Sequence, residues 1–237
     1  MSQFVGKKVL VIGGSRGIGA AIVTQFASEG ATVLFTYAGS QAASEQLAAK
    51  IGATAIRSDA AKRNELLATI RNAGPIDIFV YNAGVMVAGN PHTLDPDAVD
   101  RLIDVNLRGA YHGAVEASRS MPRGGRIVLI GSVHGDRVPF TGVAAYAMTK
   151  SGLQSLARGL ARDFGAEEIT VNVVQPGPTD TDMNPVNGPM AKIVLGPMAI
   201  KKYGTGEDVA HLVAYLAGKH ASGITGAMHT IDGGFCA

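Results

Sequence analysis

The chain is poor in several features that mark whole classes of protein. It has one cysteine, Cys236, so an internal disulfide framework is excluded and a reducing cytoplasm is expected. Charged residues make up only 17% of the chain, and the net charge of +2 comes without a basic run, which argues against nucleic-acid binding through a broad electrostatic surface. No apolar run approaches the roughly 18 residues of a membrane span, and the N-terminus lacks the apolar region of a signal peptide. We therefore expect a cytoplasmic protein that binds neither nucleic acid nor a membrane, and no metal site is predicted.

What the chain does contain is apolar sequence and glycine. Hydrophobic residues make up 46% of the chain, so there is material for a large core. Short, continuously apolar runs alternate with helical patterns, which is typical of buried parallel strands. The predicted strands cover 8–12, 31–37, 54–59, 76–84, 125–132, 169–177 and 227–232, and the predicted helices cover about 17–28, 44–51, 63–72, 96–121, 144–164 and 207–216.

This alternation predicts an α/β fold of the Rossmann-like, doubly wound kind: one seven-stranded parallel sheet with helices on both faces. We expect a single domain over residues 1–237, because no linker, repeat or low-complexity segment interrupts it. The stretch 181–204 has three prolines and broken periodicity, and an irregular insertion of this length is usually a binding loop or lid. It is the predicted substrate loop.

A glycine cluster follows the first predicted strand. In "GGSRGIG", Gly13, Gly17 and Gly19 stand between that strand and a helix. Glycine permits a tight turn and lets backbone N–H groups approach a pyrophosphate at the helix N-terminus. Taken alone, the cluster could be a plain turn. Its place at the first strand of an α/β chain favours nucleotide binding. Ser15 and Ile18, which lie within the same loop, are also predicted to contact the nucleotide.

The end of the second predicted strand indicates which dinucleotide is bound. Many NAD-binding folds have an acidic residue there to hold the ribose 2′-hydroxyl, and here the position is Tyr37. Without an acid, nothing repels a 2′-phosphate, and Arg16 and Ser40 offer a cation and a hydroxyl donor for it. The alternative is that Arg16 is only a solvated loop residue. We predict NADP(H) as the cofactor.

Polar and glycine residues gather at the predicted carboxyl ends of the other strands, where ligands bind in open α/β sheets. Asp59 is placed to accept from an adenine amino group, and Asn106 stands mid-helix, where asparagine is a poor helix former. Each residue alone could be a cap, a turn or a core hydrogen bond. Together they predict a cofactor site made of Gly13, Ser15, Arg16, Gly17, Ile18, Gly19, Tyr37, Ser40, Asp59, Ala60, Asn82, Ala83, Gly84, Pro176, Gly177, Thr179 and Thr181.

A tyrosine and a lysine stand four residues apart in "GVAAYAMTKSG". On a helix, this spacing places Tyr146 and Lys150 on one face, one turn apart. A Tyr-x-x-x-Lys match alone is weak evidence, because such a spacing can arise by chance. The sharper interpretation is a phenol that an ammonium group makes more acidic, and that therefore gives or takes a proton in catalysis.

These motifs, in this order and at these separations, resemble the short-chain dehydrogenase/reductase family over essentially the whole chain. The resemblance rests on "GGSRGIG", "NAG" at 82–84, Asn106, Ser132, Tyr146-x-x-x-Lys150, "PG" at 176–177 and "TGAMHTIDGG". The chain departs from the pattern at Ile12, where many members have threonine, which removes one hydroxyl contact.

The resemblance implies a role for each of four catalytic residues. Tyr146 would be the general acid in carbonyl reduction and the base in alcohol oxidation. Lys150 and the nicotinamide would together lower the pKa of Tyr146, and Lys150 would also hold the nicotinamide ribose. Both Tyr146 and Lys150 would contact the cofactor. Ser132 would hydrogen-bond the substrate carbonyl. Asn106 would fix a water that links Lys150 to solvent. The implied activity is that of an NADP-dependent oxidoreductase acting on a carbonyl or an alcohol, and family membership also implies a homo-oligomer, either a tetramer or a dimer.

Within the family, segments such as "FTYAGS", "IGSVHGDR" and "VVQPGPTDTD" are similar to bacterial cyclic-di-GMP-binding biofilm dispersal mediators. Motif-level similarity extends to 3-oxoacyl-acyl-carrier-protein reductases. This leaves two functions open: a carbonyl reductase, or a protein of the same fold that binds cyclic-di-GMP with little or no turnover. An intact catalytic set favours the enzyme. We expect His134, Arg137, Met183 and the 181–204 loop to line the substrate pocket, whose residues do not specify one substrate.

Overall fold

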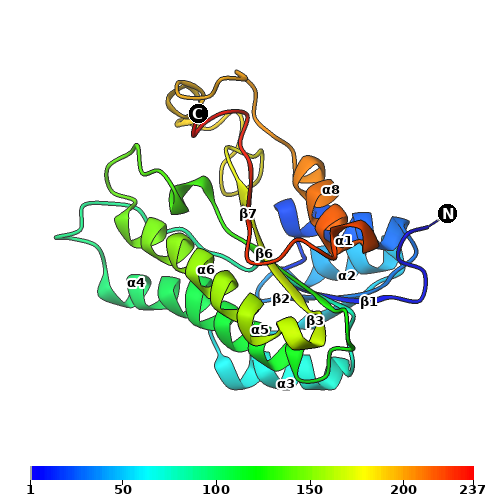
Figure 1. The fold of residues 1–237 in the computed structure, drawn as a ribbon. Helices are drawn as coiled ribbons and strands as arrows, with labels where there is room; N and C mark the ends of the chain where they lie inside the picture. The colour runs from blue at the N-terminus through cyan, green and yellow to red at the C-terminus, as the bar shows by residue number, and fades with distance from the viewer. Residues whose placement is uncertain (1) are drawn as a thin grey trace.

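A computed structural model describes residues 2–237 and contains a seven-stranded, wholly parallel sheet in the order β3-β2-β1-β4-β5-β6-β7 (Figure 1). The strands are β1 (Lys8–Ile12), β2 (Thr32–Tyr37), β3 (Thr54–Arg57), β4 (Ile78–Tyr81), β5 (Arg126–Ile130), β6 (Thr170–Pro176) and β7 (Met228–Ile231). The predicted sheet is confirmed. The strand order reverses between β1 and β4, which is where such sheets place their ligand crevice.

The main helices cover both faces of the sheet. They are α1 (Gly17–Ser28), α2 (Gln41–Ile51), α3 (Arg63–Ala73), α4 (Pro96–Ile103), α5 (Gly109–Ser118), α6 (Ala144–Asp163), α7 (Ala191–Leu195) and α8 (Gly206–Ala217). Figure 1 shows α3, α5 and α6 on one side of the sheet, and α1, α2 and α8 on the other. Helix α2 begins three residues earlier than the apolar pattern predicted.

The apolar runs of the strands are explained by this double cover. In β1, Leu10 and Ile12 pack into the core under α3, α5 and α6, whereas Val9 and Val11 pack into the core under α1 and α8. Successive side chains of a strand point to opposite faces, so a strand covered on both sides needs apolar residues at every position. All four side chains are fully buried.

The predicted long helix over 96–121 is interrupted. A π-helical turn, Asp104–Arg108, separates α4 from α5, and α5 ends at Ser118. The hydroxyl of Tyr81 on β4 donates to the carbonyl of Val105 at 2.5 Å inside this turn. A side chain at Gly109 would collide with that hydroxyl, since its Cβ would lie only 2.1 Å away. The interruption therefore depends on a contact between β4 and the helix, which helical periodicity does not reveal.

The segment 181–204 holds the short helix α7 and otherwise has no regular element. A bridge between Thr179 and Gly204 closes its base. Five of its large apolar side chains are exposed: Met183, Val186, Met190, Ile193 and Ile200. Among the helices of residues 2–237, none combines the length and apolarity that crossing a membrane requires.

Candidate active site

The glycine loop after β1 is held by side chains from two neighbouring strands. The N–H of Gly13 donates to Thr36 Oγ1 on β2 at 2.9 Å, and Asn82 Nδ2 donates to the carbonyl of Gly13 at 2.6 Å. Gly19 allows this approach, because a Cβ there would lie 2.1 Å from the Gly13 carbonyl oxygen. Thr36 was not predicted from the sequence. Its hydroxyl contacts the glycine loop. A hydroxyl contact from position 12 is missing in this chain, because Ile12 stands where many members of the resembled family have threonine.

The N-terminus of α1 is open to an anion. No side chain caps this helix end at Arg16, and its first turn carries no acidic residue. Gly17 adopts a φ of +51°, which turns the chain into the helix. The first N–H groups of a helix lack partners within the helix, and they attract negative charge. The loop therefore fits the pyrophosphate of a dinucleotide.

The segment after β6 lies directly on this loop. The Thr179 hydroxyl donates to the carbonyl of Gly177 at 3.0 Å, and the methyl group of Thr181 would lie 3.1 Å from a Cβ at Gly17. Pro176 ends β6 within the sheet. The structure thus brings the predicted residues of the sixth strand end next to those of the glycine loop.

The three residues predicted to select the 2′-phosphate differ in their exposure. Arg16 and Ser40 are exposed, whereas Tyr37 is buried at 7% exposure. The guanidinium of Arg16 forms an ion pair with Asp182 at 3.7 Å. Both of these side chains are about 70% exposed (68% and 70%), and exposed pairs of this kind contribute little to stability. The charge of Arg16 is therefore available to a ligand.

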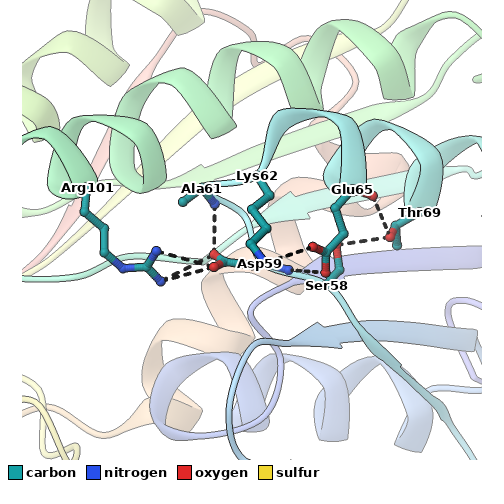
Figure 2. A network of polar contacts seen from close by, with 7 residues as sticks. All are labelled: Ser58, Asp59, Ala61, Lys62, Glu65, Thr69 and Arg101. Atoms are coloured by element: carbon teal, nitrogen blue, oxygen red, sulfur yellow. Dashed lines mark hydrogen bonds and ion pairs between the residues drawn. The ribbon is translucent and has the colours of Figure 1, made fainter.

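Asp59, predicted to face the adenine, is held by a local network (Figure 2). Its Oδ1 accepts from the N–H of Ala61 at 3.0 Å, and its carboxylate pairs with Arg101 of α4 at 3.3 Å. The N–H of Asp59 donates to Glu65 Oε1 at 2.9 Å. These contacts fix the carboxylate at the end of β3. Neither Arg101 nor Glu65 was found from the sequence, because both pairings join separate elements.

Tyr146 and Lys150 lie on one face of α6, as their spacing predicted. Lys150 Nζ lies 5.8 Å from the centre of the Tyr146 ring and donates to the carbonyl of Ile130, at the end of β5, at 2.8 Å. Lys150 is 4% exposed and Tyr146 is partly exposed. The helix thus presents a phenol at the edge of the site and an ammonium beneath it.

The pKa values of this pair are governed by burial. Burial raises the pKa of the Tyr146 phenol, and the neighbouring Ser132 side chain partly offsets this rise. Burial also lowers the pKa of the Lys150 ammonium to about 8. Within the chain alone, burial is the largest influence on the pKa of the phenol. The prediction that Lys150 and the nicotinamide ring together lower this pKa concerns the complex with the cofactor, and it stays a prediction.

Ser132 lies where β5 gives way to a short 3-10 turn, Val133–Gly135. It is 8% exposed, and its hydroxyl accepts from the N–H of His134 at 3.2 Å. The His134 ring lies 6.0 Å from the Tyr146 ring, centre to centre, and is also packed edge-on against Phe140 and Phe235. Burial lowers the pKa of His134, and a contact with the backbone carbonyl of Arg137 partly offsets this effect. The imidazole beside the tyrosine is therefore neutral near pH 7.

The other two predicted lining residues differ in their contacts. Arg137 donates to the carbonyl of Phe235 at 2.7 Å, which ties the turn to the C-terminal segment. Met183 is 50% exposed on the 181–204 segment. Of the predicted lining residues, His134 is the one that packs directly against Tyr146.

Asn106 lies in the π-helical turn and is fully buried. Its amide group exchanges hydrogen bonds with both the N–H and the carbonyl of Val85, each at 2.9 Å, and Nδ2 also donates to Thr149 Oγ1 at 3.1 Å. The Thr149 hydroxyl donates in turn to the carbonyl of Tyr146 at 2.8 Å. Asn106 therefore connects the loop after β4 to the helix that carries Tyr146. Thr149 was not predicted from the sequence.

Asn106 and Lys150 face the same small space. A methyl group at Gly84 would lie 3.5 Å from Lys150 Nζ and 3.6 Å from Asn106 Oδ1. The predicted "NAG" turn thus passes close to both groups. Among residues 2–237, no cluster of three histidine, cysteine, aspartate or glutamate side chains is placed to hold a metal ion.

The chain belongs to the short-chain dehydrogenase/reductase family. The family model described as enoyl-(acyl carrier protein) reductase matches residues 12–236. The chain is 37% identical to the 3-oxoacyl-[acyl-carrier-protein] reductase MabA of Mycobacterium tuberculosis, a match that covers 98% of this chain and 93% of MabA.

Greater similarity is found to a second kind of relative. The chain is 57% identical over 235 residues to the cyclic-di-GMP-binding biofilm dispersal mediator protein of Escherichia coli K12, and 99% of each chain is covered. The crystal structure of BdcA in complex with NADPH superimposes with a TM-score of 0.97 at 57% identity, covering 98% of this chain and 96% of that one. A Burkholderia cenocepacia short-chain dehydrogenase in complex with NADP gives a TM-score of 0.97 at 42% identity, with 99% and 100% covered.

Proposed function

We propose that the protein is an NADPH-dependent oxidoreductase that reduces a carbonyl compound to an alcohol, with Asn106, Ser132, Tyr146 and Lys150 as its catalytic set. The observation that carries this proposal is the placement of the Tyr146 phenol above the buried Lys150 ammonium, next to Ser132 and beside a glycine loop open to phosphate. NADP(H) is the cofactor, as in the related structures that contain NADPH or NADP.

Each residue of the site has a distinct task. The dinucleotide, when bound, supplies the hydride. Ser132 donates a hydrogen bond to the substrate oxygen as negative charge develops on it, and Tyr146 delivers the proton to that oxygen. Lys150 stabilises the tyrosinate that remains. Asn106 holds the loop at Val85 and the helix at Thr149 in register, and it helps to order a water for proton return to Lys150.

The reaction is tested with a panel of ketones, aldehydes and the 3-oxoacyl thioester acetoacetyl-coenzyme A. Consumption of NADPH is followed by its absorbance, and product alcohols are identified by mass spectrometry. The 3-oxoacyl compound is included because the MabA relative is a 3-oxoacyl reductase. If no carbonyl compound in the panel is reduced, the enzymatic proposal fails. The segment 181–204, with its exposed apolar side chains, is proposed to close over the bound substrate.

The cofactor preference should depend on Arg16. We expect the wild-type protein to prefer NADPH, and the double variant Tyr37→Asp, Arg16→Ala to prefer NADH. A charge-assisted hydrogen bond contributes roughly 1.5–3 kcal/mol, so the NADPH affinity should fall by about one to two decades. Calorimetry with both dinucleotides measures the change. Equal wild-type affinity for NADH and NADPH would contradict the assignment of Arg16 to the 2′-phosphate.

Binding of NADPH should weaken at alkaline pH. The pKa of Lys150 is about 8, lowered by burial from 10.5, so the buried ammonium loses its proton above pH 8. If only the charged form binds, affinity falls by up to about ten-fold per pH unit above that value. Between about pH 8 and 10.5 the unfolded chain holds this proton more tightly than the folded chain, so stability rises there while affinity falls. Fluorescence titration of NADPH from pH 7 to 9.5 measures the effect.

The control for this pH dependence is Lys150→Met, which removes the titrating group. This variant should bind NADPH weakly and with a flat pH profile over the same range. A wild-type affinity that stays constant up to pH 9.5 would contradict the role of the ammonium in holding the cofactor.

A second candidate function is cyclic-di-GMP binding, which is favoured by the name of the relative with 57% identity. This candidate is supported by the uncapped helix N–H groups at the glycine loop and by Arg16, whose ion pair with Asp182 is solvent-exposed. The net charge of +2 gives little long-range attraction elsewhere. We therefore expect cyclic-di-GMP to compete with NADPH and Arg16→Ala to weaken both. Calorimetry with and without saturating NADPH decides between the outcomes. Undiminished cyclic-di-GMP binding to the NADPH-saturated protein would show a separate site, and no binding to the cofactor-free protein would leave the reductase function alone.

We also propose a homo-oligomer, a dimer or a tetramer, that associates through α5 and α6. Tyr111 on α5 and Met148 on α6 are 48% and 51% exposed. Large apolar side chains that lie exposed on neighbouring helices are typical of a surface that a partner covers.

A further inference from the structure

A network of polar side chains lies under the turn that follows Ser132. Gln154 of α6 donates from Nε2 to Asp136 Oδ1 at 2.6 Å and to Gln175 Oε1 at 2.8 Å. Gln175 of β6 donates from Nε2 to Asp136 Oδ2 and, at 3.3 Å, to Thr230 Oγ1 of β7. The network therefore joins the turn after β5 to α6, β6 and β7.

The burial of its members shows which residue the others depend on. Gln175 has no exposed surface and Gln154 is 8% exposed, whereas Asp136 lies at the surface. Buried amide groups need hydrogen-bond partners, and leaving them without one is costly. The Asp136 carboxylate accepts from both glutamines, and a charged acceptor makes the stronger bond. An exposed side chain thus satisfies two buried ones and holds its own turn against them.

That turn is the one that carries Ser132. The N–H of Gly135 donates to the carbonyl of Ser132 at 2.9 Å, and the N–H of Asp136 donates to the carbonyl of Val133 at 3.0 Å. A Cβ at Gly135 would lie 2.9 Å from Gln154 Nε2 and 3.2 Å from the carbonyl of Lys150. The turn is therefore packed directly on α6 at the level of Lys150.

We propose that Asp136 is a positioning residue for Ser132, which acts through Gln154 and Gln175 to fix the serine hydroxyl relative to Tyr146 and Lys150. The proposal rests on the reductase function above. Asp136 does not contact the reacting atoms. It sets the separation between the group that binds the substrate oxygen and the group that protonates it, and an error in such a separation slows the reaction without preventing binding.

An exchange of acceptor and donor tests this proposal. In Asp136→Asn, a neutral amide group replaces the carboxylate and faces the amide group of Gln154. In Gln154→Glu, two carboxylates face each other. The double variant Asp136→Asn, Gln154→Glu restores one carboxylate and one amide at this contact. We expect each single variant to lower kcat on the fastest compound of the carbonyl panel by about ten-fold or more, because misplaced groups cost that much, and the double variant to recover most of the loss.

Three further measurements separate positioning from folding. In Asp136→Asn, the KM for the substrate and the Kd for NADPH should stay within about threefold of the wild-type values. A change of that size corresponds to the loss of no more than one neutral hydrogen bond. Thermal melting reports the folded fraction. Asp163→Asn, an exposed aspartate of α6 that makes no side-chain hydrogen bond within residues 2–237, is the matched control and should behave as wild type.

The outcomes are distinct. Unchanged kcat in Asp136→Asn, or a double variant no better than the singles, would overturn the positioning role. A loss of kcat that matches a loss of folded protein or of NADPH binding would overturn it as well. If the wild-type protein reduces no compound of the carbonyl panel, the reductase function itself fails. If Tyr146→Phe loses the rate and Asp136→Asn keeps it, only the positioning role fails.

Discussion

Replacing Tyr146 by phenylalanine is expected to lower kcat by a factor of about 100 to 10,000, the range that a general acid contributes. The phenol is the proposed proton donor, and α6 presents it at the edge of the site with Lys150 Nζ 5.8 Å from its ring centre. Phenylalanine keeps the ring and its packing against His134. Turnover of NADPH with the best carbonyl substrate measures the loss.

The same variant should keep its affinity for the cofactor within about threefold, because at most one neutral hydrogen bond is lost. Lys150→Ala is the comparison, and it should lose both turnover and NADPH affinity, since the ammonium is proposed to hold the cofactor as well as to support the tyrosine. Substantial turnover by Tyr146→Phe would show that another group delivers the proton and would remove the tyrosine from the mechanism.

Burial changes the pKa of both Tyr146 and Lys150. Burial raises the pKa of Tyr146 within the chain, although a proton donor works best with a pKa nearer the working pH. Burial also lowers the pKa of Lys150, so that the lysine is close to losing its charge at pH 8. We propose that the positive nicotinamide ring supplies the remaining attraction for the tyrosinate. The tyrosine would then ionise readily only beside the oxidised, positively charged form of the cofactor, so that proton transfer to the substrate oxygen would be coupled to hydride transfer.

Much of the fold was predictable because its signals are local. The apolar run at residues 8–12 and the glycine loop before residue 17 predicted the bounds of β1 and α1 as the structure has them. The pairing of Tyr146 with Lys150 followed from helical spacing. The NADP(H) prediction, made from Tyr37, Arg16 and Ser40, agrees with the related structures, which contain NADPH or NADP.

What the sequence did not reveal depends on contacts between distant segments. The π-helical turn at Asn106 is accompanied by a hydrogen bond from Tyr81, on another element, to the carbonyl of Val105. Thr36 and Asn82 hold the glycine loop from two different strands. The burial that raises the tyrosine pKa is likewise a property of the packed molecule. None of these contacts has a sequence spacing that could indicate it.

The glycine loop gives the second large effect, because two glycines of helices respond in opposite ways to the same change. Alanine is the better helix former at any interior helical position, by roughly 0.5–1 kcal/mol. At Gly159 of α6 nothing lies within 4 Å of an added Cβ, so Gly159→Ala should raise the free energy of unfolding by about that amount. At Gly19 of α1 the Cβ would lie 2.1 Å from the Gly13 carbonyl oxygen and 2.6 Å from Asn82 Nδ2.

Gly19→Ala must therefore push the Gly13 carbonyl away and break its hydrogen bond with Asn82. We expect a loss of about 1–3 kcal/mol in unfolding free energy, as for other overpacked sites, and a fall in NADPH affinity of at least about ten-fold, since the displaced loop no longer presents its N–H groups to the pyrophosphate. Urea unfolding and fluorescence titration of NADPH measure the two effects, with Gly159→Ala as the matched control. If Gly19→Ala is as stable as wild type and binds NADPH as tightly, then the close contact between the loop and Asn82 is not what shapes the phosphate site.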